Sequence, residues 1–338
     1  MRKLTVLSYG GGQDSKTLLM KYIRDAEFRL RYAPEDFVVV MSATGDEHDH
    51  TYRDLEEVQR LCREHHIEFH HITPNMGFHS PAWSDLISPQ KRGPDSPFEA
   101  TLVQLGTKSC TDHLKISVIY KFLDEWINTR YQYGFKIAKE RGCGKRAMKR
   151  FVEEHGNIHV MIGFAAGEES RMNKSLVLQA KQQADEGDCF WKGITRQFPL
   201  IDMGMDRKAC QQYIASTGVT VPYPSNCMRC PYMSPEELLW LFIHAPAKYH
   251  EWVEIEAAKL ERFRHLEGTQ SLDREGNPKQ DSKGKPVMFK NHGVFNTKET
   301  IPEKLDRVWS KYLHMTYPEL LAFLDDFKMN HGCSKGNY

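Results

Sequence analysis

Three consecutive glycines at the joint between a strand-like run and a helix-like run constrain this chain more than any other feature. The apolar run of residues 4–8 precedes glycines 10–12, and residues 15–25 then repeat apolar side chains at helical spacing. Glycines at such a joint let the backbone approach an oxyanion closely, and the amide groups at the helix start point towards it. A tight structural turn is the alternative, but the pattern favours an anion site.

The residues that follow the glycines refine this expectation. Ser15 adds a hydroxyl donor to the loop. The carboxylate of Asp14 does not favour bare phosphate, so we expect Asp14 to hold Mg²⁺ or to orient the loop. The Gly-Lys-Ser/Thr of a Walker loop does not follow, and the G-x-G-x-x-G spacing of a dinucleotide site is absent. The loop therefore differs from both of these phosphate-binding motifs.

Strand-like and helix-like segments alternate through the first quarter of the chain. Residues 37–41 form a continuous apolar run of the buried-strand type, and residues 67–72 are predicted as a third strand. Residues 54–65 have helical periodicity, with Thr51 and Asp54 as the predicted capping box. This alternation predicts an α/β fold with a doubly wound, mostly parallel sheet and right-handed crossovers.

Two parts are predicted along the chain. The first is an α/β domain of residues 1–235, with residues 158–164 and 197–201 as further strands and an insertion at about 76–155. The second, residues 236–338, is a mostly helical extension.

Local signals mark several element ends. Asp206 is predicted to cap a short helix, and Ser234 with the glutamates after Pro235 is a strong helix start. The polar residues 268–290 are predicted to form a flexible loop or a hairpin, and the tail 331–338 is expected to be loose.

Composition narrows the classes of partner. The 338 residues are 40% hydrophobic and 27% charged, an ordinary globular balance. The 46 basic and 45 acidic residues leave a formal charge of +1, so the global charge implies no polyanionic partner. The apolar runs are far shorter than the roughly 20 residues that span a bilayer, so we expect no membrane partner. The first residues lack a secretory hydrophobic region, so we expect a cytoplasmic protein.

The clearest metal signal is a pair of cysteines, Cys227 and Cys230. Two thiolates two residues apart can hold one metal, or two irons of a cluster, from a single turn. Unliganded buried thiols are the alternative. By contrast, Cys62 lies on the apolar face of a helical pattern and is predicted to be a small buried hydrophobe.

Five segments together resemble the PP-loop ATP pyrophosphatases and, within that class, the phosphoadenosine phosphosulfate (PAPS) reductase family. The resemblance looks closest to phage-type and DNA-phosphorothioation members. Residues 11–15 are similar to the family's Ser-Gly-Gly-x-Asp-Ser loop and residues 42–47 to its Thr-Gly-x-Glu segment. Residues 108–115 resemble its cysteine segment and residues 163–171 its Gly-x-Arg-x-x-Glu-Ser segment. Pro199-Leu-Ile-Asp202, then Cys227-x-x-Cys230-Pro231, resembles its closing order.

The resemblance implies an adenine nucleotide α-hydrolase-like, Rossmann-like fold that binds ATP, or PAPS or adenosine phosphosulfate (APS), with Mg²⁺. Asp14 and Ser15 are the implied catalytic residues of the loop. The residues implied to bind nucleotide are Ser8, Gly10, Gly11, Gly12, Gln13, Asp14, Ser15, Ser42, Thr44, Gly45, Gly163, Glu169, Ser170 and Arg171.

The resemblance also adds Cys110 to Cys227 and Cys230 as a metal ligand. It favours a four-iron four-sulfur cluster, with zinc as the alternative, and the fourth ligand is open between Cys210, His113 and Cys333.

Several positions depart from the family pattern. Gly10 replaces the first serine of the loop, and Phe164 stands in the region where an arginine is expected, so Arg171 or Lys174 is expected to supply that charge. The Glu-Cys-Gly-Leu/Ile-His tail of the reductases is absent. Cys333, in an approximate echo of that tail, is the candidate nucleophile.

Three functions are therefore predicted. The first is ATP α,β-cleavage that adenylates an acceptor and is coupled to cysteine- or cluster-dependent sulfur transfer. The alternatives are reduction of PAPS or APS, and a nucleotide-binding accessory protein without catalysis. The basic segment from Lys136 to Arg150 is a candidate contact for a nucleic acid acceptor, and a sulfur donor or thioredoxin-like protein is the implied protein partner.

Overall fold

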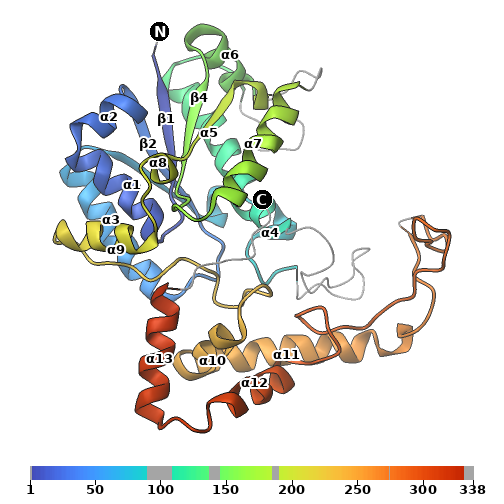
Figure 1. Cartoon of the computed structure of the whole chain (residues 1–338). Helices are drawn as coiled ribbons and strands as arrows, with labels where there is room; N and C mark the ends of the chain where they lie inside the picture. The colour runs from blue at the N-terminus through green and yellow to red at the C-terminus, as the bar shows by residue number, and fades with distance from the viewer. Residues whose placement is uncertain (1, 90–108, 137–144, 185–189, 274, 331–338) are drawn as a thin grey trace. The chain divides into compact units, whose positions relative to one another are not determined.

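The computed structural model describes residues 2–89, 109–136, 145–184, 190–273 and 275–330 (Figure 1). The described residues fall into two compact units. One unit, here called the sheet unit, takes in residues up to 86, residues 109–227 and residues 328–330. The other, the helical unit, takes in residues 87–89 and 228–327. Each unit is described by itself.

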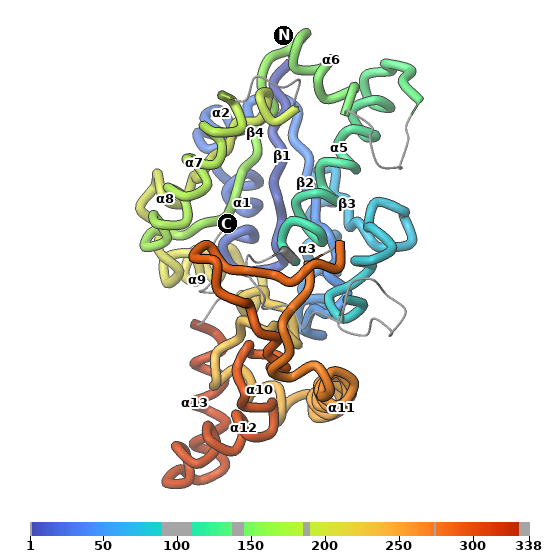
Figure 2. Tube along the Cα trace, turned by 90° about the vertical axis from the view of Figure 1, so that its right-hand side faces the viewer, coloured from blue at the N-terminus to red at the C-terminus, as the bar shows by residue number. Residues whose placement is uncertain are grey.

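The sheet unit is built on five parallel strands, which confirms the predicted α/β class. They are β1 (Leu4–Ser8), β2 (Asp36–Ser42), β3 (Glu68–Ile72), β4 (Ile158–Ile162) and β5 (Ile194–Gln197). Their order across the sheet is β3-β2-β1-β4-β5, and the first four can be followed in Figure 2. In the register, Val6 lies opposite both Val38 and Val160. The direction in which successive strands are added reverses between β1 and β4, so the topological switch point of the sheet lies between these two strands.

Helices cover both faces of this sheet (Figure 1). One side carries α1 (Gln13–Arg24), α2 (Ala26–Tyr32), α3 (Asp49–Glu64), α8 (Pro199–Asp202) and α9 (Arg207–Ser216). The other side carries α5 (Ser117–Arg130), α6 (Arg146–His155) and α7 (Glu169–Ala184). The short α4 (Ser109–Thr111) leads through a π-helical turn, Asp112–Ile116, into α5.

Alternate residues of each central strand enter the two cores between the sheet and its helices. Leu4 and Val6 of β1 pack with α5 and α6, whereas Leu7 of the same strand packs with α1, α2 and α3. In β2, Val38 and Val40 likewise enter the core that contains α5 and α6, whereas Val39 and Met41 enter the core that contains α1, α2 and α3. Because both faces are buried, every strand position can be apolar, and this explains the continuous apolar runs in the sequence.

Two predicted elements were wrong in detail. Residues 197–201 are not a strand: β5 ends at Gln197, and Pro199 begins α8. Proline has no amide for a strand ladder, but it fits the first turn of a helix. The helix predicted from residue 54 begins at Asp49, so Thr51 and Asp54 lie inside α3 and do not cap it. The predicted cap at Asp206 is confirmed, because its carboxylate accepts a hydrogen bond from Ala209 N at 2.8 Å.

The helical unit contains α10 (Pro235–His244), α11 (Pro246–Arg262), α12 (Ile301–Trp309) and most of α13 (Tyr317–Asn330). The predicted start of α10 is confirmed, since Ser234 and Glu237 form a reciprocal capping box. Buried Glu256 of α11 accepts hydrogen bonds from Val294 N at 2.7 Å and Ile301 N at 2.6 Å, so it fixes the start of α12. Trp240 Nε1 donates to Asp325 Oδ1 at 3.2 Å and joins α10 to α13. None of the described helices is both long and apolar enough to cross a bilayer.

A buried lysine joins α1 to α3 in the sheet unit. Lys16 is fully buried, and its Nζ lies 2.5 Å from Asp54 Oδ1 and 2.7 Å from Glu57 Oε2. Tyr9 OH donates to the other oxygen of Asp54 at 3.3 Å. Burial raises the pKa of Asp54, and the Lys16 ammonium opposes that rise. The ion pair therefore holds the helix of the glycine loop against α3.

We expect Lys16→Met to lower the free energy of unfolding by about 3–5 kcal/mol, because it leaves the buried Asp54 carboxylate without its cation. Urea denaturation at pH 7 measures this loss. Arg60→Met is the control, since Arg60 pairs with Glu64 at an exposed position and should change stability by less than about 1 kcal/mol. A loss in Lys16→Met no larger than that of the control would contradict the assigned role of the pair.

Candidate functional site

The glycine loop follows β1 and is closely packed. Gly11 has φ of 75°, a left-handed conformation that glycine adopts without strain. A Cβ atom on Gly11 would lie 2.9 Å from Thr51 Cγ2, and one on Gly12 would lie 2.8 Å from Ser225 N. These contacts leave no room for a side chain at either position. The glycines are therefore required by the packing of the loop.

The end of β4 meets this loop at the switch point. A Cβ atom on Gly163 would lie 2.9 Å from Ser15 N and 3.0 Å from the carbonyl carbon of Asp14. The backbone after β4 and the first turn of α1 are therefore in direct contact. The strand order places this contact at the carboxyl edge of the sheet, where open α/β folds bind ligands.

The loop closes on itself through Ser15. Ser15 Oγ accepts a hydrogen bond from Gly10 N at 3.2 Å and donates to Gly12 O at 3.1 Å. Gly12 is the N-cap of α1 and has no side chain to cap it. The first-turn amides of α1 have no acceptor within the helix, so they can donate to an anion.

Asp14 lies in this first turn with an unsatisfied carboxylate oxygen. Its Oδ1 atom is buried and has no hydrogen-bond partner among the described residues. Burial, with a smaller contribution from Glu168, raises the pKa of Asp14 to about 6, although the nearby Arg207 and Arg171 act to lower it. A carboxylate in this state can accept a cation or a donor from a ligand. The residue thus fits the predicted role of holding Mg²⁺, which prefers carboxylate oxygens.

Two arginines share Glu168 beside the loop. Arg171 pairs with Glu168 at 2.5 Å, and Arg207 lies 4.0 Å from the same carboxylate. The guanidinium of Arg171 also lies over the ring of Phe164, 4.3 Å from its centroid. The sequence analysis missed Arg207, which carries no motif. Its only signal is its place directly after a helix-capping aspartate.

The residues after β2 form an internally bonded loop. Glu47 Oε1 accepts from Thr44 N at 2.9 Å and from Thr44 Oγ1 at 2.7 Å. Gly45 has φ of 74° and is packed against Asp85. Ser42 Oγ donates to Leu114 O at 2.6 Å, and this bond fixes the π-helical turn to β2. This loop follows β2, the neighbour of β1, at the same edge of the sheet.

The other residues expected to bind nucleotide lie at the ends of β1 and β4. Ser8 is the last residue of β1. Glu169 and Ser170 begin α7, and Glu169 Oε1 accepts from Gly167 N at 2.8 Å.

The three predicted cysteine ligands are divided between the two units. Cys227 Sγ lies 3.4 Å from Thr44 Oγ1, and burial raises the pKa of this thiol to about 12. Cys110 belongs to α4 of the sheet unit, whereas Cys230 is in the helical unit. Among the described residues, no three His, Cys, Asp or Glu side chains form a group that could hold a metal ion. The ligand set of Cys110, Cys227 and Cys230 therefore stays a prediction.

Two further predictions fall wholly or partly outside the described residues. Cys333 lies beyond Asn330, where the described chain ends. Of the basic segment from Lys136 to Arg150, residues 137–144 are not described. Arg150 pairs with Glu154 at 2.6 Å within α6. The described part of this segment therefore gives no support for a nucleic acid contact.

The last described residues of the chain lie on the glycine-loop helix. Gln13 Nε2 donates to Met329 O at 3.1 Å and to Pro222 O at 2.8 Å. Arg207 donates to Asn330 O at 3.0 Å. The contact between Gln13 and Met329 could not be predicted, because the two residues are 316 positions apart and no local pattern links them.

No family model matches this chain, and a search of curated proteins finds none that is similar to it.

We expect Asp14→Asn to raise stability at pH 7.5 by about 1–3 kcal/mol. The raised pKa means that the folded state resists ionisation of Asp14, so this cost is absent below pH 4 and complete above pH 6. Asparagine keeps the shape without the charge. Urea denaturation between pH 4 and pH 8 should show a gain that grows through this interval.

The matched control is Asp25→Asn at the other end of α1. Hydrogen bonding from Phe28 N lowers the pKa of Asp25, so its charged form is favoured in the folded state. Asp25→Asn should not stabilise the protein at any pH. If the stability of both variants changed with pH in the same way, the raised pKa assigned to Asp14 would be contradicted.

Proposed function

We propose that the sheet unit is an adenine nucleotide α-hydrolase-like domain that binds ATP at its switch point and cleaves it between the α and β phosphates. The observation that carries the proposal is the contact of the glycine loop with Gly163, beside the unsatisfied oxygen of Asp14. It combines a phosphate cradle, a carboxylate that lacks a partner and flanking arginines at the edge of the sheet where ligands bind. The resemblance to PP-loop ATP pyrophosphatases supports the same chemistry.

The residues of the site have separate roles in this proposal. The first-turn amides of α1 and the Ser15 hydroxyl bind the phosphates that leave as pyrophosphate. Arg171 and Arg207 stabilise the charge that develops on them. Asp14 holds the Mg²⁺ that accompanies ATP, and Mg²⁺ neutralises charge on the phosphates. The loop after β2, which contains Thr44 and Gly45, and the start of α7, which contains Ser170, bind the adenosine side of the nucleotide.

The α-phosphate is the electrophile in this reaction. An acceptor nucleophile bonds to the α-phosphorus, the bond to the bridging oxygen breaks, and adenylated acceptor and pyrophosphate result. Sulfur transfer to the activated acceptor would follow from a separate sulfur donor, with nucleic acid as an acceptor class.

A second candidate, reduction of PAPS or APS, is favoured by the contact of the chain end with the loop. Arg207 donates a hydrogen bond to the carbonyl of Asn330, which is three positions before Cys333 in the sequence. In that reaction the Cys333 thiolate would bond to the sulfate sulfur, and the nucleoside phosphate would leave. A thioredoxin-like dithiol would then release sulfite and become a disulfide. A nucleotide-binding accessory protein without turnover is the remaining alternative.

Pyrophosphate release tests the leading proposal. With ATP and Mg²⁺, and with duplex DNA or tRNA added as acceptor, we expect AMP-containing product and pyrophosphate rather than ADP and phosphate. Asp14→Asn should lower the rate at least 100-fold, because the metal-holding charge is lost, while Asp25→Asn should keep it. Coupled pyrophosphate detection and chromatography of the nucleotides measure both. Full turnover in Asp14→Asn would refute the assignment of the loop.

Removal of residues 331–338 separates the two reactions. If ATP cleavage is the function, pyrophosphate release should survive nearly unchanged. If sulfonucleotide reduction is the function, the truncated protein should lose sulfite production from PAPS yet still bind nucleotide. Binding is read from the rise in melting temperature, since saturation at 100 times Kd adds about 2.7 kcal/mol. Continued sulfite production by the truncated protein would exclude Cys333 as the nucleophile.

A further inference from the structure

Residues 268–290 of the helical unit form an arm that is closed by its own backbone. Ser271 N donates to Val287 O at 2.8 Å, Val287 N donates to Lys279 O at 3.0 Å, and Lys279 N donates to Ser271 O at 2.7 Å. These bonds make a closed triangle of three chain segments, spaced eight residues apart. Three antiparallel bridges flank it. Figure 1 shows the arm projecting beyond the end of α11, away from α10 and α12.

The two turns of the arm repeat one motif, Asp-x-x-Gly-x-Pro. Asp273 Oδ1 accepts from the amides of Glu275 and Asn277, both at 2.9 Å. Asp281 Oδ1 accepts in the same way from the amides of Lys283 at 2.8 Å and Lys285 at 2.9 Å. Two of the three acidic side chains of the arm therefore bind its own backbone, and these bonds hold the turns in shape.

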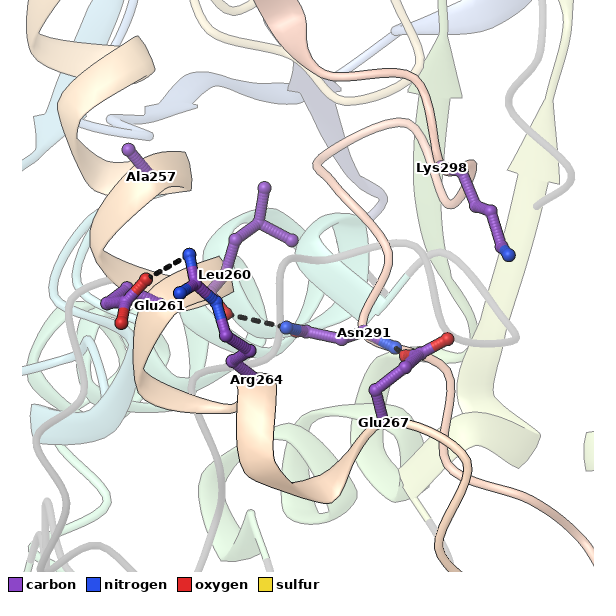
Figure 3. A pocket seen from close by; sticks show the side chains of 7 residues that line it. All are labelled: Ala257, Leu260, Glu261, Arg264, Glu267, Asn291 and Lys298. Carbon is purple, nitrogen blue, oxygen red and sulfur yellow. Dashed lines mark hydrogen bonds and ion pairs between the residues drawn. The ribbon is translucent and has the colours of Figure 1, made fainter.

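The root of the arm is clamped to α11 (Figure 3). Asn291 Nδ2 donates to Leu260 O at 2.6 Å, and the amide of Asn291 donates to Glu267. Lys259 Nζ binds Asn291 Oδ1 at 3.0 Å from the other side. Leu260, Glu267 and Asn291 border an open groove of about 550 Å³ that Arg264 and Lys298 also line. The arm is thus fixed at its root and closed at its centre.

Unpaired lysines distinguish the surface of this arm. Lys279, Lys283, Lys285 and Lys290 are all exposed. Across the part of the chain that the structure describes, no carboxylate forms an ion pair with any of these four. The segment 268–290 holds five basic and three acidic residues, whereas the whole chain is nearly neutral. The arm therefore concentrates positive charge on a projecting, backbone-ordered frame.

We propose that this arm binds the sugar–phosphate backbone of duplex nucleic acid. Lysine ammonium groups contact phosphates without reading sequence, and a frame that is ordered before binding loses little entropy when it binds. The inference is independent of the proposed ATP chemistry, because binding is measured without nucleotide.

The arm lacks the features of the competing partners. Single strands are bound by stacking bases on exposed aromatic rings, and the arm's one aromatic residue, Phe289, packs near Phe263. A membrane-inserting arm needs a continuous apolar tip, whereas Leu272 and Met288 are its only exposed large apolar side chains, 61% and 45% exposed. The arm carries exposed positive charge but lacks stacking rings and a continuous apolar tip, so duplex nucleic acid is the favoured partner.

Fluorescence anisotropy tests the proposal with the full chain and a labelled 30-base-pair DNA duplex from 50 to 200 mM KCl. An RNA duplex of the same sequence is measured in parallel, and it distinguishes binding to a DNA backbone from binding to an RNA backbone. Four phosphate contacts predict a fall in affinity of about 100-fold over this range. The variant K279Q/K283Q/K285Q/K290Q should bind at least 10-fold more weakly at 50 mM, and its salt slope should fall by about 3. The backbone triangle involves no lysine side chain, so the variant keeps its frame.

The control K3Q/K181Q/K248Q/K311Q removes the same charge from exposed lysines elsewhere and should keep both affinity and slope. Equal losses in the control would show a net-charge effect and overturn the proposal. Unchanged binding in the arm variant, or no binding of either duplex by the wild type, would overturn it as well. Arm-dependent binding to anionic phosphatidylserine vesicles but not to duplexes would replace it with a membrane partner.

Discussion

The structure of the sheet unit depends on one constraint: the backbone segments that follow β1 and β4 lie in direct contact. Gly12 lies against Ser225 N, and Gly163 lies against the first turn of α1, so the loops after β1 and β4 and the segment near residue 225 meet without intervening side chains. This contact sets the position of the first helical turn. It thereby sets the direction of the α1 amides and the burial of Asp14, from which the charge balance of the site follows.

Much of the fold could be predicted from local sequence patterns. The parallel sheet could be predicted because apolar runs and helical periodicity depend only on residues close together in the sequence. Alternating strands and helices then indicate parallel pairing with crossover connections. The caps at Asp206 and Ser234 were equally readable, since a cap bonds only two or three residues away. The prediction of a strand at residues 197–201 was wrong because apolar residues suit a buried helical turn as well as a strand. Pro199 favours the helical turn, and it begins α8.

Features that depend on distant partners could not be predicted. Lys16 looks like a surface residue until α3 brings Asp54 and Glu57 to it. Arg207 joins the site only because α9 begins beside the glycine loop, and no local motif marks it. Cysteine spacing indicates that a pair of thiols can share a metal, but it does not say whether a third ligand arrives. Among the described residues none does.

The bond between Gln13 and Met329 has a consequence for the order in which the protein is made. Gln13 is synthesised 316 positions before its partner carbonyl. Strands β1 and β2 can pair long before that point, but the surroundings of the glycine loop stay incomplete until α13 has emerged. A nascent chain therefore passes through a stage in which the sheet has formed and the loop is still open on this side. Nucleotide present during translation meets the finished loop only after α13 has been made.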